Sequence, residues 1–135
     1  MIVVDTNVVA YTVIPGERTE AALAIARRDP DWVAPRLWRS ELRNVLATAL
    51  RLKRMRLANA LAAFGAAEEI VEDIDVEGMV GECLELAQRA GISAYDAEFV
   101  LVAEQMGLQL VTADRRLAKA FPSRAVFVED FAAES

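Results

Sequence analysis

The stretch Ile2-Val3-Val4-Asp5-Thr6-Asn7 begins with an apolar run that ends abruptly at an aspartate. Near the other end of the chain, Leu108-Gln109-Leu110-Val111-Thr112-Ala113-Asp114 has the same pattern. Short β-rich apolar runs of this kind, each followed by a turn-forming acid, are typical of parallel strands in an α/β sheet. Ligands bind outside the carboxyl ends of such strands. The two stretches therefore predict a parallel sheet that brings Asp5 and Asp114 to one shared site.

Strand-like and helix-like segments alternate along the whole chain. The pattern predicts strands at residues 2–4, 32–34, 70–71, 108–111 and 126–128, with a short tail after the last one. It predicts helices at residues 6–14, 17–28, 36–53, 57–67, 77–90, 94–106 and 115–120, and the helices at 36–53 and 57–67 could form a hairpin. This alternation indicates βαβ units with right-handed crossovers, and so an α/β fold in which residues 1–135 form one domain.

The composition excludes several classes of chemistry. The chain has no histidine, which removes Ser-His-Asp and Cys-His catalysis and histidine-bound zinc. The single Cys83 can form no intramolecular disulfide, so we expect a reducing, cytoplasmic setting. We find no signal-peptide pattern and no apolar stretch of the roughly 18 residues that a membrane span needs. Carboxylates are plentiful, with 21 Asp and Glu residues, and they suit hard cations such as Mg²⁺ or Mn²⁺.

Positive charge is concentrated in one part of this acidic chain. The formal net charge is −6, yet residues 36–56 contain seven arginines and lysines and a single acid, Glu41. A local basic stretch can contact phosphates even on an acidic protein. Arg39 and Arg43, which flank Glu41, are therefore candidate nucleic-acid contacts. The alternative interpretation is an ordinary solvated helix face.

Four carboxylates lie at positions where an acid could either belong to a binding site or only stabilise the start of its own helix. Asp5 and Asp114 could be N-caps, and Asp96 falls in a first turn where the helix dipole favours an acid. Glu41 lies at the border of an apolar helical face, where a buried charge without a partner would be very costly. Together the four predict a divalent-metal site. Two such ions about 4 Å apart can clamp the oxygens of a phosphodiester, and this chemistry requires no histidine base.

Four segments of the chain also resemble the acidic motifs of a known family. They are Val4-Asp5-Thr6-Asn7, Trp38-Arg39-Ser40-Glu41-Leu42-Arg43-Asn44-Val45-Leu46, Ala94-Tyr95-Asp96-Ala97 and Leu110-Val111-Thr112-Ala113-Asp114-Arg115-Arg116-Leu117. In order and spacing they are similar to the four motifs of PIN-domain ribonucleases, above all the VapC toxins of bacterial and archaeal toxin–antitoxin pairs. The similarity extends over nearly the whole chain.

The resemblance implies a three-layer α/β/α domain around a parallel sheet of about five strands. It implies endonucleolytic cleavage of RNA that depends on Mg²⁺ or Mn²⁺. Asp5, Glu41, Asp96 and Asp114 match the catalytic, metal-binding acids. Family members often form homodimers and are held inactive by a small antitoxin protein.

Asn7 and Thr112 match the polar positions that support the family's acids by hydrogen bonds. Some members carry a further acid after the last motif, where this chain has Arg115 and Arg116. The resemblance therefore assigns four acidic ligands and leaves a fifth unsupported.

Two other interpretations remain open from the sequence. The chain could be a degenerate PIN domain that binds a partner without catalysis, although all four acids are present. It could instead be a haloacid-dehalogenase-like phosphatase with Asp5 as the nucleophile. That family needs a second aspartate where this chain has Asn7, and neither Lys53 nor Lys119 lies in a matching motif.

Overall fold

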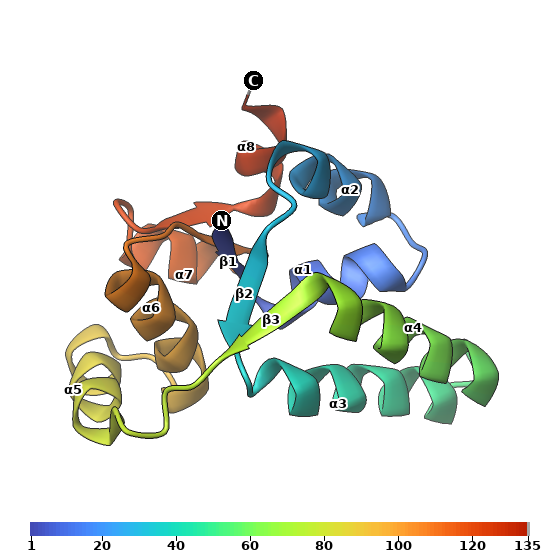
Figure 1. Ribbon diagram of the computed structural model, residues 1–135, viewed down its shortest axis with the longest axis horizontal. Helices are drawn as coiled ribbons and strands as arrows, with labels where there is room; N and C mark the ends of the chain where they lie inside the picture. The colour runs from blue at the N-terminus through green and yellow to red at the C-terminus, as the bar shows by residue number, and fades with distance from the viewer. Residues whose placement is uncertain (135) are drawn as a thin grey trace.

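A five-stranded parallel sheet forms the centre of the molecule (Figure 1). The computed structural model describes residues 1–134. The strands are β1 (Ile2–Val4), β2 (Trp32–Pro35), β3 (Val71–Ile74), β4 (Leu110–Thr112) and β5 (Ala125–Phe127), and they lie in the order β3-β2-β1-β4-β5. Every neighbouring pair is parallel, which confirms the sheet expected from the sequence.

Helices cover both faces of this sheet. They are α1 (Thr6–Val13), α2 (Thr19–Arg28), α3 (Trp38–Arg51), α4 (Leu57–Ile70), α5 (Val80–Ala90), α6 (Ala94–Met106), α7 (Arg115–Ala120) and α8 (Val128–Ala133). The chain steps from β1 to β2 to β3 with the first four helices on one face, then returns to β4 across the other face through α5 and α6. The result is the α/β/α architecture, and α3 and α4 form the expected hairpin beside the sheet (Figure 1).

The direction of chain progression reverses between β1 and β4. These two strands are neighbours, with Val3 opposite Leu110 and Val4 opposite Val111, although more than 100 residues separate them in the chain. The helices that follow the two strands lie on opposite faces of the sheet, which leaves an opening beyond the strand ends. This is the topological switch point at which open α/β sheets bind ligands.

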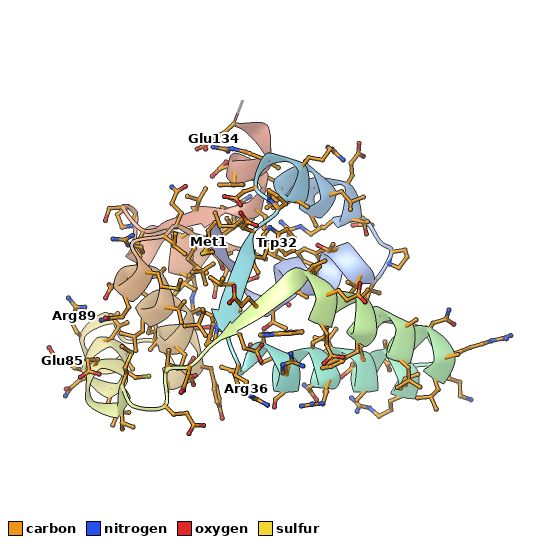
Figure 2. All side chains as sticks on the ribbon, viewed as in Figure 1. Met1, Trp32, Arg36, Glu85, Arg89 and Glu134 are labelled. Carbon is orange, nitrogen blue, oxygen red and sulfur yellow. The ribbon has the colours of Figure 1, made fainter. Side chains whose placement is uncertain are left out.

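The strand and helix sequences account for this arrangement. Ile2, Val3 and Val4 are β-branched and buried on both faces of the sheet, as a central parallel strand requires. On the face of the sheet opposite to α1–α4, helix α6 contacts β1, β2 and β4 and buries Phe99 and Val100 among other apolar side chains. Figure 2 shows Met1 and Trp32 at the amino ends of β1 and β2, and Arg36 beyond the carboxyl end of β2.

Several element boundaries differ from those expected. Ile70 completes α4, so β3 starts at Val71, and α5 begins at Val80 rather than at residue 77. The last strand covers Ala125–Phe127 rather than residues 126–128. The largest difference is α8, which replaces the expected tail: its buried Phe131 packs under Arg28, whose guanidinium carbon lies 4.1 Å from the ring centroid.

No helix within residues 1–134 is long and apolar enough to cross a membrane.

One carboxylate in β3 fixes the position of α3. Asp73 accepts hydrogen bonds from the indole Nε1 of Trp38 at 2.7 Å and from Nε of Arg39 at 2.8 Å. Arg39 also reaches Glu68 on α4, with 2.6 Å between Nη1 and Oε2. Trp38 is fully buried, so Asp73 satisfies a polar group that water cannot reach. These bonds attach the first turn of α3 to both β3 and α4.

We predict that Asp73→Ala lowers the free energy of unfolding by about 1–3 kcal/mol, because it leaves the buried Trp38 Nε1 without an acceptor. Urea denaturation followed by far-UV circular dichroism measures the change. Glu72→Gln, at the exposed neighbouring position of the same strand, is the matched control and should change stability little. Equal stability of the two variants would show that the Asp73 cluster contributes nothing to the fold.

Candidate active site

Asp5 is both a helix cap and a link between strands. It directly follows β1, and its Oδ1 accepts a hydrogen bond from the amide of Val8 at 3.0 Å, which caps α1. Its Oδ2 accepts two more, from the hydroxyl of Thr112 at 2.6 Å and from the amide of Ala113 at 2.9 Å. One carboxylate oxygen of Asp5 therefore caps α1, and the other joins the end of β1 to the end of β4.

Thr112 connects Asp5 to the second strand-end acid. Its side chain is fully buried; the hydroxyl donates to Asp5 and accepts from the amide of Asp114 at 3.0 Å. Asp114 in turn caps α7, because its Oδ1 accepts from the amides of Arg116 and Leu117. One hydroxyl thus sets the relative position of the two acids, which is the supporting place predicted for Thr112.

Glu41 is held by a residue that the sequence analysis did not select. The hydroxyl of Thr6, the first residue of α1, donates to Oε1 of Glu41 at 2.6 Å. Thr6 is buried, whereas Glu41 in the first turn of α3 is half-buried. The sequence could have marked Thr6 as a site residue, because it is polar and directly follows a strand-end acid. It could not have shown that Glu41 is its partner. Thr6 gives the glutamate the partner that its partial burial demands.

Asp96 approaches from the opposite face of the sheet. It lies in the first turn of α6, whose N-cap Ser93 accepts a hydrogen bond from the Asp96 amide at 3.0 Å. Ser93 therefore caps the helix without help from Asp96. The half-buried carboxylate of Asp96 lies in the wall of the same cleft as the other acids.

All four predicted acids line one cleft of about 440 Å³ at the carboxyl ends of β1 and β4. The structure thus brings together side chains from the β1 end, α3, α6 and the β4 end. The predicted Asn7 and Thr112 line it too. Further polar residues of the wall, which the sequence analysis did not select, are Thr6, Ser40, Asn44 and Tyr95.

Burial and neighbouring acids raise the pKa values of Asp5, Glu41 and Asp96. Burial raises the pKa of Asp5, and the charge of Asp114 adds to this, against the hydrogen bonds from Thr112, Ala113 and Val8. Burial, then the charges of Asp96 and Asp5, raise the pKa of Glu41, while the bond from Thr6 opposes them. Burial and Asp114 likewise raise the pKa of Asp96. The four carboxylates therefore form one electrostatically coupled group.

Comparison with known proteins identifies the family. A family model described as PIN domain matches residues 2–121. The chain belongs to the PIN domain family. This membership favours the nuclease interpretation of the Asp5 site over the haloacid-dehalogenase alternative.

Two relatives extend over most of this PIN domain. It is 29% identical to "Ribonuclease VapC3" of Pyrobaculum aerophilum over 125 residues, which cover 90% of this chain and 95% of the relative. Its fold is similar to the crystal structure of PAE2754 from Pyrobaculum aerophilum, with a TM-score of 0.78 and 26% identity over 97% of this chain and 92% of the other.

The donor set of the PIN domain cleft fits a hard divalent cation. Its wall offers carboxylate, hydroxyl and amide oxygens, and no arginine or lysine of residues 1–134 lines it. Within the same residues, no three acidic or cysteine side chains lie close enough together to form a preformed metal-binding cluster. Mg²⁺ suits such a wall, because it is usually bound by one or two carboxylates and keeps several waters or substrate phosphate oxygens. Asp5, Glu41, Asp96 and Asp114 are the residues that would hold it.

The two arginines predicted to contact nucleic acid occupy different settings. Arg39 is half-buried and held by Asp73 and Glu68. Arg43 is exposed, with its guanidinium carbon 5.2 Å from the ring centroid of Phe64. Both line a second cavity beside the acidic cleft. The sequence could not separate them, because ion pairing depends on which elements pack together.

We predict that Asp96→Asn makes the metal-free protein more stable at pH 7, so that its Tm rises. The folded-state pKa of Asp96 lies above its ordinary value of 3.8, so the folded protein binds more protons than the unfolded chain between those two pKa values. The stability contributed by Asp96 is therefore lost as pH rises through that window. Asparagine does not titrate, so the advantage of the variant should grow with pH there and then level off.

Chemical denaturation in EDTA at several pH values between roughly 3.5 and 7.5 tests this prediction, because it gives the free energy of unfolding of the native chain and of the variant as a function of pH. Glu104→Gln, at an exposed position of the same helix, is the matched control for removing one negative charge. A variant that is less stable than the native chain at every pH would show that Asp96 carries no electrostatic penalty.

Proposed function

We propose that this PIN domain is a metal-dependent endoribonuclease and the toxin of a toxin–antitoxin pair. The observation that carries the proposal is the convergence of Asp5, Glu41, Asp96 and Asp114 from four separate elements on one cleft. Similarity to a relative named as a ribonuclease supports RNA as the substrate and hydrolysis of its phosphodiester bonds as the reaction.

The side chains of the cleft perform distinct parts of this reaction. A bound Mg²⁺ or Mn²⁺ would supply Lewis-acid activation of water and neutralise charge on the scissile phosphate. Thr112 orients Asp5 and Thr6 orients Glu41, each through a single hydroxyl proton. These bonds favour the ionised carboxylates, which is the form that binds a cation. Asp96 and Asp114 complete the negative charge of the cleft from the other side of the switch point.

The proposal extends to partners and cellular setting. RNA is the substrate, a cognate antitoxin protein is the inhibitor, and the active form is a homodimer in the cytoplasm. The similarity to "Ribonuclease VapC3" supports RNA as the substrate. The antitoxin follows from the resemblance of the four acidic motifs to those of VapC toxins. Residues 1–135 form a single nuclease domain in this proposal.

The decisive experiment incubates the protein with a mixed pool of structured and unstructured RNA in Mg²⁺, in Mn²⁺ and in EDTA. We predict cleavage that requires the metal and that falls at least 100-fold in Asp96→Asn, because the variant loses a metal-binding charge. Glu104→Gln should cut at the native rate, since Glu104 is exposed at the far end of α6. Sequencing the fragment ends gives the target.

Other outcomes reject the proposal in different ways. Cleavage that persists in EDTA would exclude a metal-dependent mechanism. Tight Mn²⁺ binding by the native chain, without cleavage of any RNA, would favour the alternative of a binding module. Cleavage retained in Asp96→Asn would place the catalytic residues elsewhere.

We predict that Arg43→Ala weakens RNA binding and reduces the slope of log K against log salt concentration by about 0.7, as expected for one lost contact to a single strand. Arg39→Ala should also reduce RNA binding, but it should lower the Tm as well, because Arg39 is paired with Asp73 and Glu68. Fluorescence anisotropy in EDTA at several salt concentrations measures both. Unchanged slopes would remove this basic stretch from the RNA path.

A further inference from the structure

The acidic cleft is the middle of a longer groove. Leu37 and Ser40 belong both to its wall and to that of a cavity of about 700 Å³, which also contains Arg36 and Arg43. On the other side, Asn7 and Val45 are shared with a cavity of about 390 Å³. A polymer with a phosphate at the four acids can leave the cleft through these two flanking cavities.

The smaller cavity, which we call the Tyr11 pocket, lies between α1, the α1–α2 turn and the start of α2. Its wall consists of Asn7, Ala10, Tyr11, Ile14, Pro15, Gly16, Glu17, Arg18, Thr19 and Val45. The turn satisfies its own polar groups, because the Thr19 hydroxyl accepts from the Gly16 amide at 2.9 Å and donates to the Ile14 carbonyl at 3.3 Å. The pocket therefore has a fixed and largely apolar wall.

Tyr11 is held in place at this wall by Arg18. Nη1 of Arg18 donates to the Tyr11 hydroxyl at 3.2 Å, and its guanidinium carbon lies 5.1 Å from the centroid of the tyrosine ring. Arg18 is anchored in turn by an ion pair with Glu129 of α8. An aromatic ring that is fixed before a ligand arrives loses little conformational entropy on binding.

We propose that the Tyr11 pocket binds one unpaired nucleobase of the RNA, next to the phosphate that is cut, by stacking on Tyr11. This inference rests on the proposed ribonuclease function. Bases of a duplex are paired and stacked within the helix, whereas an unpaired base can turn out and stack on an aromatic side chain. Asn7, at the border of cleft and pocket, offers an amide donor and acceptor to the base edge.

The two ends of the groove favour RNA over a protein segment. On one side of the acids, the larger cavity offers the exposed Arg36 and Arg43 as phosphate contacts (Figure 2 shows Arg36). Its wall also carries Asp73, Asp75, Glu77 and Glu98, and Asp73 is paired with Arg39. The Tyr11 pocket presents an aromatic ring with a guanidinium beside it on the other side. Arginine contacts to phosphates and an aromatic ring for a base are two elements of single-strand recognition.

The test uses short single-stranded RNA oligonucleotides that carry one 2-aminopurine, whose fluorescence is quenched by stacking, at successive positions. Binding is measured in EDTA, so that it does not depend on cleavage. We expect quenching at one position with the native chain and with Tyr11→Phe, and none at that position with Tyr11→Leu. Affinity should fall about tenfold in Tyr11→Leu, as for one lost base–aromatic stack. An abasic site at that position should weaken native binding by a similar factor and leave Tyr11→Leu unaffected.

A second variant keeps the test decisive if Tyr11→Leu does not fold. A Cβ added at Gly16 meets no atom within 4 Å, so Gly16→Leu should fold and should occlude the Tyr11 pocket from its outer wall. Equal RNA affinity and equal quenching in native, Tyr11→Leu and Gly16→Leu proteins would overturn the proposal and leave the pocket to a protein partner. Metal-dependent cleavage in the RNA pool is scored separately, so its loss rejects the ribonuclease and not the binding pocket.

Discussion

The structure depends on holding like charges together where two neighbouring strands end. β1 and β4 end side by side at the switch point, and the hydrogen bonds from Thr112 and Ala113 to Asp5 join their ends there. The backbone bond from the Asp5 amide to the Val111 carbonyl, at 3.1 Å, continues the same connection. Without these contacts the repulsion between Asp5 and Asp114 would act on an open edge of the sheet. The buried strands behind them provide the rigidity that the cleft requires.

Helix α3 meets two demands at its first turn. Glu41 faces the cleft. Trp38 and Arg39 face β3 and α4, where Asp73 accepts hydrogen bonds from both and Glu68 pairs with Arg39. The second set of contacts stabilises the fold, whereas the first imposes a cost, since burial and neighbouring acids raise the pKa of Glu41. An electrostatically unfavourable position for Glu41 is tolerated because the contacts of the adjacent Trp38 and Arg39 fix the position of the helix.

The sequence predicted the sheet and the nearness of Asp5 and Asp114, because both follow from strand ends in a parallel topology. Glu41 and Asp96, which lie on helices, were expected in the same place from their positions at the border of apolar faces and from the family resemblance. It could not predict that Thr6 holds Glu41, since nothing local reveals which helices pack together. Arg39 and Arg43 looked equivalent, yet only tertiary packing brings Glu68 and Asp73 to Arg39. The helix α8 was missed because its short sequence gains stability from packing on α2 and from Arg28, not from its own periodicity.

The choice of threonine as the partner of two acids has a physical reason. A hydroxyl donates one proton to a carboxylate and favours its ionised form without cancelling its charge. An arginine or lysine in the same place would stabilise the carboxylate more strongly, but it would compete with a metal ion for the same oxygens. Within residues 1–134 the cleft wall has two such threonines, Thr6 and Thr112, and no basic side chain. Asp5 and Glu41 are thus oriented but not neutralised, which is compatible with the divalent cation that we propose for this cleft.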